Sequence, residues 1–161
     1  MLDPVSRKFL NVGGGNGNRF SPAQFPIFLL ETSDDRFLYG LPDLGNGLKL
    51  AEHHGGQVSS RDDVNRRVDP DEAHRFRGFV EPYFPSLPDG PVESAVCTYT
   101  NTPDGHFIID RHPGHANVFV ISACSGHGFK FAPAIGEVVA ESVTGRAPRV
   151  DMNPFGIGRF V

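Results

Sequence analysis

The stretch CSGHGFKFAPAIGEVV, residues 124–139, holds one histidine between two glycines, with a lysine shortly after them. The seven residues before it are typical of a buried strand, and the apolar residues within it recur at helical spacing. A helix that starts after such a turn presents backbone N–H groups without partners, and these attract phosphate, carboxylate or a developing anion. Gly126 and Gly128 lack a Cβ and would let a flat ligand approach the backbone, while Lys130 adds a positive charge. The pattern predicts an anion or oxyanion site, with a sharp turn that merely needs two glycines as the equally weighted alternative.

Two more candidate residues lie on the predicted strand LKLAEH, residues 48–53. Strand alternation places Lys49 and His53 on one face, opposite the two leucines. Taken alone, such residues are more often a solvated lysine and a surface histidine than parts of a site. His54 follows His53 directly, but neighbouring strand residues point apart and no carboxylate or cysteine stands at ligand spacing. We therefore expect no metal site.

A thiol lies on the predicted strand VESAVCTYTNT, residues 92–102. Cys97 and Tyr99 fall on the same face of this strand. A lone strand cysteine is usually a small buried apolar residue. The chain has two cysteines, Cys97 and Cys124, and its first residues show no apolar segment typical of a signal peptide. We therefore expect a reducing, cytoplasmic location.

The elements that must position these residues are predicted from periodicity and turn residues. The sequence predicts strands at 25–32, 36–42, 48–53, 92–102, 106–110 and 117–123, a helix from Asp69–Pro70 to Pro82, and a helix from near Lys130 to Gly145. The first three strands are joined by short turns, which predicts an antiparallel meander. The expected fold class is α+β.

Composition argues against two kinds of partner. The net charge is −4, the isoelectric point is about 5.9 and no basic run occurs, so we expect no nucleic-acid partner. No apolar stretch is long enough to span a bilayer, so we expect no membrane partner. Residues 1–19 end in the run GGGNGNR, which has no strand before it and no helix after it. This segment is interpreted as a flexible lead-in rather than a phosphate loop.

Several separated motifs resemble one family in its order and spacing. VCTYTNTPDGHFIID (96–110), followed by HPGHANVFVISACSGHGFKFAPAIGEV (112–138), resembles the monomeric sarcosine oxidase and N-methyltryptophan oxidase family. These are FAD-dependent amine oxidases of the D-amino-acid-oxidase superfamily. YGLPDLGNGLKLAEHH (39–54) resembles the family's substrate-domain hairpin, and DDVNRRVDPDEAHRFRGFVEPYFP (62–85) fits the segment between. The resemblance covers the chain from about Phe25 to the C-terminus.

The resemblance implies an organisation for the chain. Residues 1–19 would be the lead-in, and residues 20–91 a portion of the substrate domain with its antiparallel sheet. Residues 92–161 would supply the C-terminal strand and helix elements of a Rossmann-like FAD-binding domain whose N-terminal part is missing.

The resemblance also implies roles for residues on the predicted strands. Cys97 matches the cysteine that carries FAD through a thioether at the flavin 8α position. Tyr99 matches an aromatic residue near the substrate, and Lys49 matches the lysine that promotes reduction of oxygen. His53 matches a histidine of the substrate pocket, and Tyr39 a further pocket tyrosine.

Roles for the glycine turn follow in the same way. His127 and Lys130 match pocket residues, and the lysine helps to hold the substrate carboxylate. The backbone of Gly126, Gly128 and Phe129, together with those two residues, would face the flavin pyrimidine ring. A helix start there would stabilise negative charge on the ring.

The implied reaction is oxidation of an N-methyl or secondary amino acid, sarcosine-like, with O2 to an imine and H2O2. The chain departs from the family in lacking a G-x-G-x-x-G motif, and Cys124 stands where a bulky apolar residue is expected. We therefore predict that the isolated chain neither binds FAD tightly nor turns over, and that a partner chain supplies the N-terminal FAD-binding half. The alternatives are a non-catalytic remnant or subunit of a split oxidase, and an unrelated α+β binding module.

Overall fold

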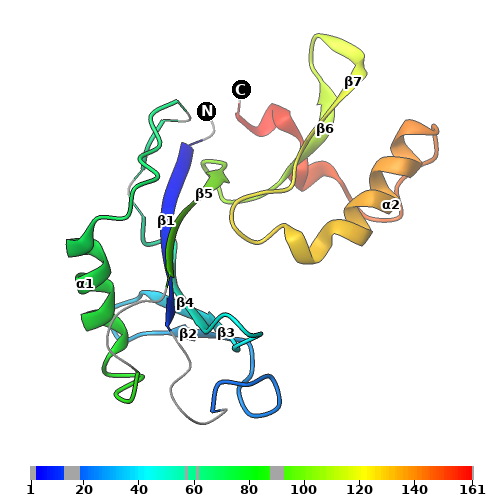
Figure 1. Ribbon diagram of the computed structural model, residues 1–161. Helices are drawn as coiled ribbons and strands as arrows, with labels where there is room; N and C mark the ends of the chain where they lie inside the picture. Colours follow the sequence, from blue (N-terminus) through cyan, green and yellow to red (C-terminus); the bar gives the residue numbers. More distant parts are fainter. Residues whose placement is uncertain (1–2, 13–18, 57, 61, 88–92, 161) are drawn as a thin grey trace. The chain divides into compact units, whose positions relative to one another are not determined.

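The computed structural model describes residues 3–12, 19–56, 58–60, 62–87 and 93–160. Its strands and helices are β1 (Asp3–Val12), β2 (Phe28–Glu31), β3 (Phe37–Leu41), β4 (Leu48–His53), α1 (Pro70–Val80), β5 (Glu93–Asn101), β6 (Ile108–His112), β7 (His115–Ser122) and α2 (Ala132–Val143), with 3₁₀ turns η1 (Phe129–Phe131), η2 (Asn153–Phe155) and η3 (Ile157–Phe160) (Figure 1). The chain divides into a sheet unit, Val5–Thr98, and a hairpin unit, Tyr99–Val161 with Met1–Pro4. Each unit is described by itself. The expected α+β class, with antiparallel sheets, is confirmed.

The sheet unit is built on a five-stranded sheet in the order β2-β3-β4-β1-β5. The predicted meander is confirmed, because β3 pairs antiparallel with both β2 and β4. Cross-strand partners share a face, so alternation along one strand fixes the faces of its neighbours. In β4, whose predicted bounds are those observed, Leu48 and Leu50 are fully buried on one face, and Lys49 and His53 are half-buried on the other.

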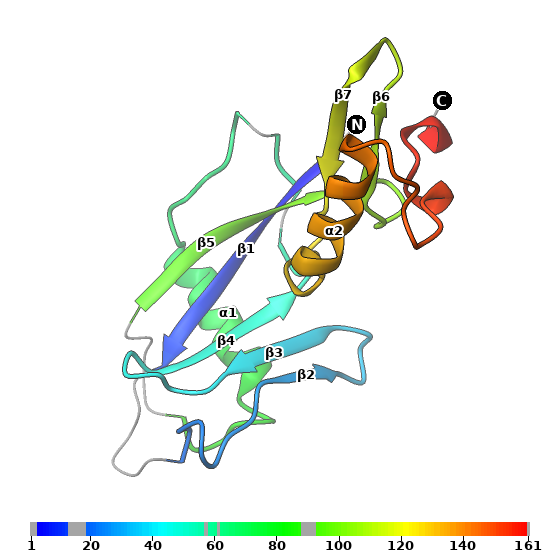
Figure 2. The same cartoon turned by 90° about the vertical axis from the view of Figure 1, so that its right-hand side faces the viewer.

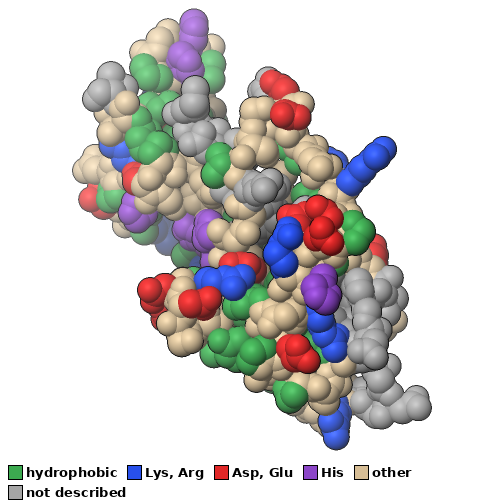
Figure 3. All heavy atoms as spheres, turned by 90° about the vertical axis from the view of Figure 1, so that its left-hand side faces the viewer, with side chains coloured by type: hydrophobic (Ala, Val, Ile, Leu, Met, Phe, Trp, Pro, Cys, Tyr) green, Lys and Arg blue, Asp and Glu red, His purple; other side chains and the backbone are tan. Residues whose placement is uncertain are grey.

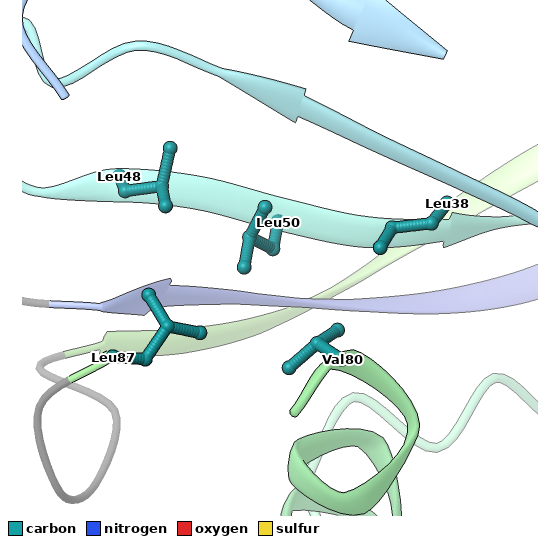
Figure 4. Packing of buried hydrophobic residues seen from close by; sticks show 5 residues of the cluster. All are labelled: Leu38, Leu48, Leu50, Val80 and Leu87. Carbon is teal, nitrogen blue, oxygen red and sulfur yellow. The ribbon is translucent and has the colours of Figure 1, made fainter. Parts of the chain in front are cut away.

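The core of the sheet unit forms between one face of this sheet and helix α1. Leu38, Leu48 and Leu50 have no exposed surface, and Val80 at the end of α1 is equally buried. Figure 4 shows Val80 directed toward the leucines of β3 and β4, with Leu87 beside them. Burial of each such side chain contributes about 1.5–3 kcal/mol to folding.

Helix α1 begins where its sequence predicts. The Asp69 carboxylate accepts the N–H of Asp71 at 2.9 Å, and Pro70 occupies the first helical position. The helix packs against the core through Phe76 and Phe79.

Arg36, which lies just before β3, joins the sheet to this helix. The Nε and Nη2 of Arg36 donate to the two carboxylate oxygens of Glu52, each at 2.7 Å. The same guanidinium lies 3.7 Å from the ring centroid of Phe79, a cation–π contact. The hydrogen bond to Glu52 raises the pKa of Arg36, so the guanidinium stays charged.

The hairpin unit holds β6 and β7, an antiparallel pair with Ile108 opposite Ser122 and a register shift near its tip. Helix α2 runs beside this hairpin (Figure 2), and apolar hollows between hairpin and helix are lined from both. The helix ends as predicted, because Gly145 has a φ of 76° and Arg146 donates its N–H to the carbonyl of Glu141.

The N-terminal segment differs from its prediction as a flexible lead-in. Residues Asp3–Val12 form β1, which lies between β4 and β5 and pairs antiparallel with β4 from Phe9 to Val12. The glycine run at 13–18 lies outside the described residues. A strand with partners far along the chain gives a weak local signal, which is why the pattern missed it.

The prediction of a buried strand at 117–123 is wrong. The strand is present as β7, but none of its residues is buried, and Val118 and Ile121 are more than 40% exposed. Within the described residues β7 pairs with β6 alone. In α2, likewise, Val138 is the one buried apolar side chain.

The described residues carry charges of both signs at the surface. Acidic and basic side chains are interspersed on the face drawn in Figure 3. Neither described helix has the length and apolar character needed to cross a bilayer.

The core predicts a contrast between two leucine substitutions. Leu50→Ala removes a fully buried side chain and should lower the free energy of unfolding by about 2–5 kcal/mol. Leu29→Ala, at a side chain that is 61% exposed, is the matched control and should change it by less than about 1 kcal/mol. Urea denaturation followed by circular dichroism measures both. Equal effects would contradict the assignment of the core face.

Candidate active site

The turn between β7 and α2 is tied to the end of β5. Ser125 donates its N–H to the carbonyl of Thr100 at 2.8 Å, and its hydroxyl accepts the N–H of Thr102 at 3.3 Å. Both Ser125 and Thr102 are buried. Ser125 has a φ of 52°, an uncommon left-handed conformation that these hydrogen bonds hold in place.

The two glycines of the turn are required by the fold itself. Gly126 has a φ of 77°, and a Cβ there would collide with the ring of Tyr99. A Cβ on Gly128 would collide with the carbonyl of Ala123. The space that the missing side chains leave is therefore filled by the chain, which favours the sharp-turn interpretation of the glycines over a ligand cradle.

His127 is oriented by its own turn. Its Nδ1 lies 2.9 Å from the carbonyl oxygen of Ser125. A carbonyl only accepts, so Nδ1 carries the proton and the neutral ring keeps a lone pair at Nε2. One face of the imidazole stacks on Phe107, with ring centroids 4.9 Å apart and an interplanar angle of 27°.

The helix start lies where the sequence predicts it. The 3₁₀ turn Phe129–Phe131 leads into α2 without a side-chain cap. Phe131 donates its N–H to the carbonyl of Gly128, and Ala132 donates to the carbonyl of Phe129. Lys130 is exposed at this end. A hollow of about 470 Å³ is lined by Lys130 and His127 together with mostly apolar side chains of α2 and the C-terminal segment. A cation, an imidazole and an apolar wall can bind an amphipathic anion there.

The predicted face of β4 is confirmed in the sheet unit. Lys49 pairs with Leu41 of β3, and Tyr39 pairs with Ala51, so Lys49, Tyr39 and His53 share one face. The rings of Tyr39 and His53 are edge to face, with centroids 6.2 Å apart. This face, opposite the leucine core, presents an ammonium, a phenol and an imidazole.

Cys97 is an exposed free thiol on β5, and its neighbour Val96 is buried. Cys97 is therefore not the small buried core residue that a strand cysteine usually is. Tyr99 follows on the same face by alternation, and its ring packs on Gly126.

The structure thus brings the predicted residues together in two groups. Tyr99 and the residues from Gly126 to Lys130 form one group in the hairpin unit, and Lys49, His53 and Tyr39 form the other in the sheet unit. Cys97 belongs to the sheet unit, on β5. In the described ranges no three His, Cys, Asp or Glu side chains are grouped so as to hold a metal ion.

Two contributors to the site were missed from the sequence. Phe107 was read only as part of a strand, and Thr102 only as the end of one. The turn TPDG, which begins at Thr102, was the available signal, because a hydroxyl at the start of such a turn often hydrogen-bonds to the backbone a few residues on. Here Thr102 Oγ1 donates to the carbonyl of His106 at 2.6 Å.

The fold is that of solved oxidases. Fructosyl amine: oxygen oxidoreductase (Amadoriase I) from Aspergillus fumigatus has a TM-score of 0.69 and 21% identity, over 92% of this chain and 36% of that chain. Glycine oxidase from Geobacillus kaustophilus has a TM-score of 0.65 and 22% identity, over 98% and 39%. At these identities the similarity establishes the fold alone.

Sequence comparison then gives the family. The family model described as "FAD dependent oxidoreductase" (DAO) matches residues 4–142. The N-methyl-L-tryptophan oxidase of Salmonella newport (strain SL254) is 38% identical over 162 residues, covering 99% of this chain and 43% of that protein. This chain belongs to the FAD-dependent oxidoreductase family, as the motifs predicted, and the similarity extends further toward the N-terminus than Phe25. The chain spans less than half the length of the curated relatives it matches.

The glycine turn predicts a test that needs no ligand. Gly128→Ala should lower the free energy of unfolding of the chain by more than about 1 kcal/mol, because the new Cβ meets the Ala123 carbonyl. Gly136→Ala, inside α2 with open space around its Cβ, is the matched control and should raise stability by about 0.5–1 kcal/mol. Thermal unfolding without flavin measures both. An unchanged Gly128→Ala chain would restore the ligand-cradle interpretation.

Proposed function

We propose that this chain forms part of an FAD-dependent amine oxidase that oxidises an N-methyl or secondary amino acid, sarcosine-like, with O2 to an imine and H2O2. The observation that carries the proposal is 38% identity to an N-methyl-L-tryptophan oxidase over 99% of the chain, in a chain of the FAD-dependent oxidoreductase family. The chain spans 43% of that relative, and the activity we propose is that of this chain together with an N-terminal FAD-binding half.

The residues present fit FAD. When bound, FAD supplies the redox chemistry that moves electrons from the amine to oxygen. The exposed free thiol of Cys97 is available for a thioether to the flavin. The backbone N–H groups of Gly128 and Phe129, just before the helix, are donors suited to a ring that gains negative charge, whereas the N–H of His127 donates to the carbonyl of Cys124.

The chain's own side chains have distinct tasks in this proposal. Lys130, exposed beside an apolar hollow, binds the substrate carboxylate. The Lys49 ammonium stabilises negative charge that develops on oxygen. In the sheet unit, His53 and Tyr39, whose rings meet edge to face, contact the substrate in this proposal. In the hairpin unit, Tyr99 is an aromatic residue near the substrate.

Exposed apolar surface supports the need for a further FAD-binding portion. Phe129 is 96% exposed, and the apolar side chains of β7 are nowhere buried. Monomeric proteins rarely leave such a surface uncovered, because its burial is favourable.

The proposal includes a cytoplasmic location, where a reducing environment keeps both cysteines free, as they are here.

Covalent flavin is the first test. The chain is produced with and without a partner carrying the FAD-binding half, denatured in acid, and examined for flavin absorbance that stays with the protein. We expect retained flavin with the partner, an adduct mapped by mass spectrometry to Cys97, and its loss in Cys97→Ala. Cys124→Ala, at the other exposed thiol, should retain it.

Two outcomes would contradict this prediction in different ways. A chain that stays colourless with the partner would be a remnant without catalytic function. Oxygen consumption with sarcosine and added FAD by the isolated chain would contradict the need for a partner.

Lys49 predicts a defect confined to the oxygen step. In the assembled enzyme, Lys49→Met should slow reoxidation of the reduced cofactor by about 10²-fold or more, because it removes the charge that stabilises the developing anion. Lys49→Arg keeps the charge and should retain most of the rate. Stopped-flow measurements separate anaerobic reduction, which should change little, from reoxidation. A loss of the reductive rate with normal reoxidation would show that Lys49 acts on the amine instead.

A further inference from the structure

Arg159 ties the C-terminal segment to the loop 104–107. Arg159 of η3 donates from Nε to Asp104 Oδ2 at 2.7 Å and from Nη2 to the carbonyl of Phe107, also at 2.7 Å. Its Nη1 donates to the carbonyl of Gly156 at 2.8 Å. The side chain of Arg159 is 20% exposed and that of Asp104 is 34% exposed, so the arginine is the more enclosed partner of this ion pair. The arginine therefore fixes the loop 104–107 on its own segment.

The charge of this ion pair is maintained. The hydrogen bond from Arg159 holds the pKa of Asp104 well below its usual range, so the carboxylate stays ionised. Asp104 also accepts the N–H of His106 at 3.1 Å, which shapes the turn before Phe107. A planar guanidinium can serve a carboxylate and a carbonyl together, which a lysine cannot do with the same geometry.

The clamped loop carries a ring that reaches His127. Phe107 is 6% exposed, with its ring stacked on His127 at 4.9 Å and on Phe155 at 5.9 Å between centroids. The ring of Phe131 meets it edge to face at 5.6 Å. Phe155 belongs to the same C-terminal segment as Arg159. One face of the imidazole is thus held by Phe107, and Phe107 is itself held by Phe155 and Arg159 of the C-terminal segment.

We propose that Arg159 is a positioning residue for His127, through Phe107, and that it keeps the imidazole with Nδ1–H on Ser125 and Nε2 free to accept a hydrogen bond from a ligand N–H. The role in the reaction rests on the proposed function, because an amino-acid substrate would supply that N–H. The orientation of the ring rests on the contacts above alone. Stacking fixes the ring plane, and the Nδ1–H to carbonyl bond fixes the flip of the ring and the site of its proton.

The test reads the proton position directly. Nitrogen-15 NMR of the histidine-labelled chain at neutral pH distinguishes Nδ1–H from Nε2–H, and His127→Gln assigns the signal. We expect His127 in the Nδ1–H form in the unsubstituted chain. In Arg159→Gln the ratio of Nδ1–H to Nε2–H should fall about fivefold, as expected when one hydrogen bond of ordinary strength loses its support.

Three variants complete the comparison. Arg159→Lys keeps the charge without the fork and should give an intermediate ratio. Phe107→Leu keeps a buried apolar side chain without the stack and should reproduce Arg159→Gln. Arg149→Gln, at an arginine that is 80% exposed, should leave the signal unchanged. If Arg159→Gln fails to fold, Arg159→Lys and Phe107→Leu decide the question.

A second readout separates this inference from the proposed function. In the assembled oxidase, Arg159→Gln should lower turnover while the thermal midpoint stays within the range of Arg149→Gln. An unchanged His127 signal in folded Arg159→Gln and Phe107→Leu would overturn the positioning role even if the enzyme is active. A shifted signal in a chain that never oxidises amines would support the positioning role and overturn the proposed function.

Discussion

A buried pair of hydroxyls holds the hairpin unit together. Thr102, at the end of β5, and Ser125, at the start of the glycine turn, lie 3.3 Å apart through their hydroxyl oxygens, and both are almost fully buried. Because buried polar groups must be satisfied, this contact fixes how β5 meets the turn. The left-handed backbone of Ser125, the packing of Tyr99 on Gly126 and the orientation of His127 all follow from that meeting point.

Local signals predicted most of the sheet unit. The meander, the bounds of β4 and the cap at Asp69 were predicted because alternation and capping residues act over a few positions. The shared face of Lys49 and His53 followed from the same periodicity. Strand β1 was missed, because a strand that pairs with distant residues has no short-range turn to announce it.

The sequence predicted the elements of the site but not the packing contacts that hold them. The motif around His127 pointed to a helix start and a turn, and both are present. What filled the space at Gly126 and Gly128 could not be predicted, because the ring of Tyr99 and the Ala123 carbonyl arrive by tertiary packing. The sequence predicted that β7 is buried, because its residues are apolar, but none of them is buried. Apolar composition favours burial and does not show which element covers a strand.

Strand β7 has one more property that follows from its single described neighbour. Along the edge away from β6, its backbone N–H and C=O groups face no other strand of the described residues. Such an edge recognises any extended segment by main-chain hydrogen bonds, largely without regard to sequence. A correct strand added there would cover the edge and the apolar side chains at once. If β7 of a second copy paired there, further copies could add in the same way and form a fibre. Correct folding therefore requires that the intended strand pairs with this edge before another copy of the chain does.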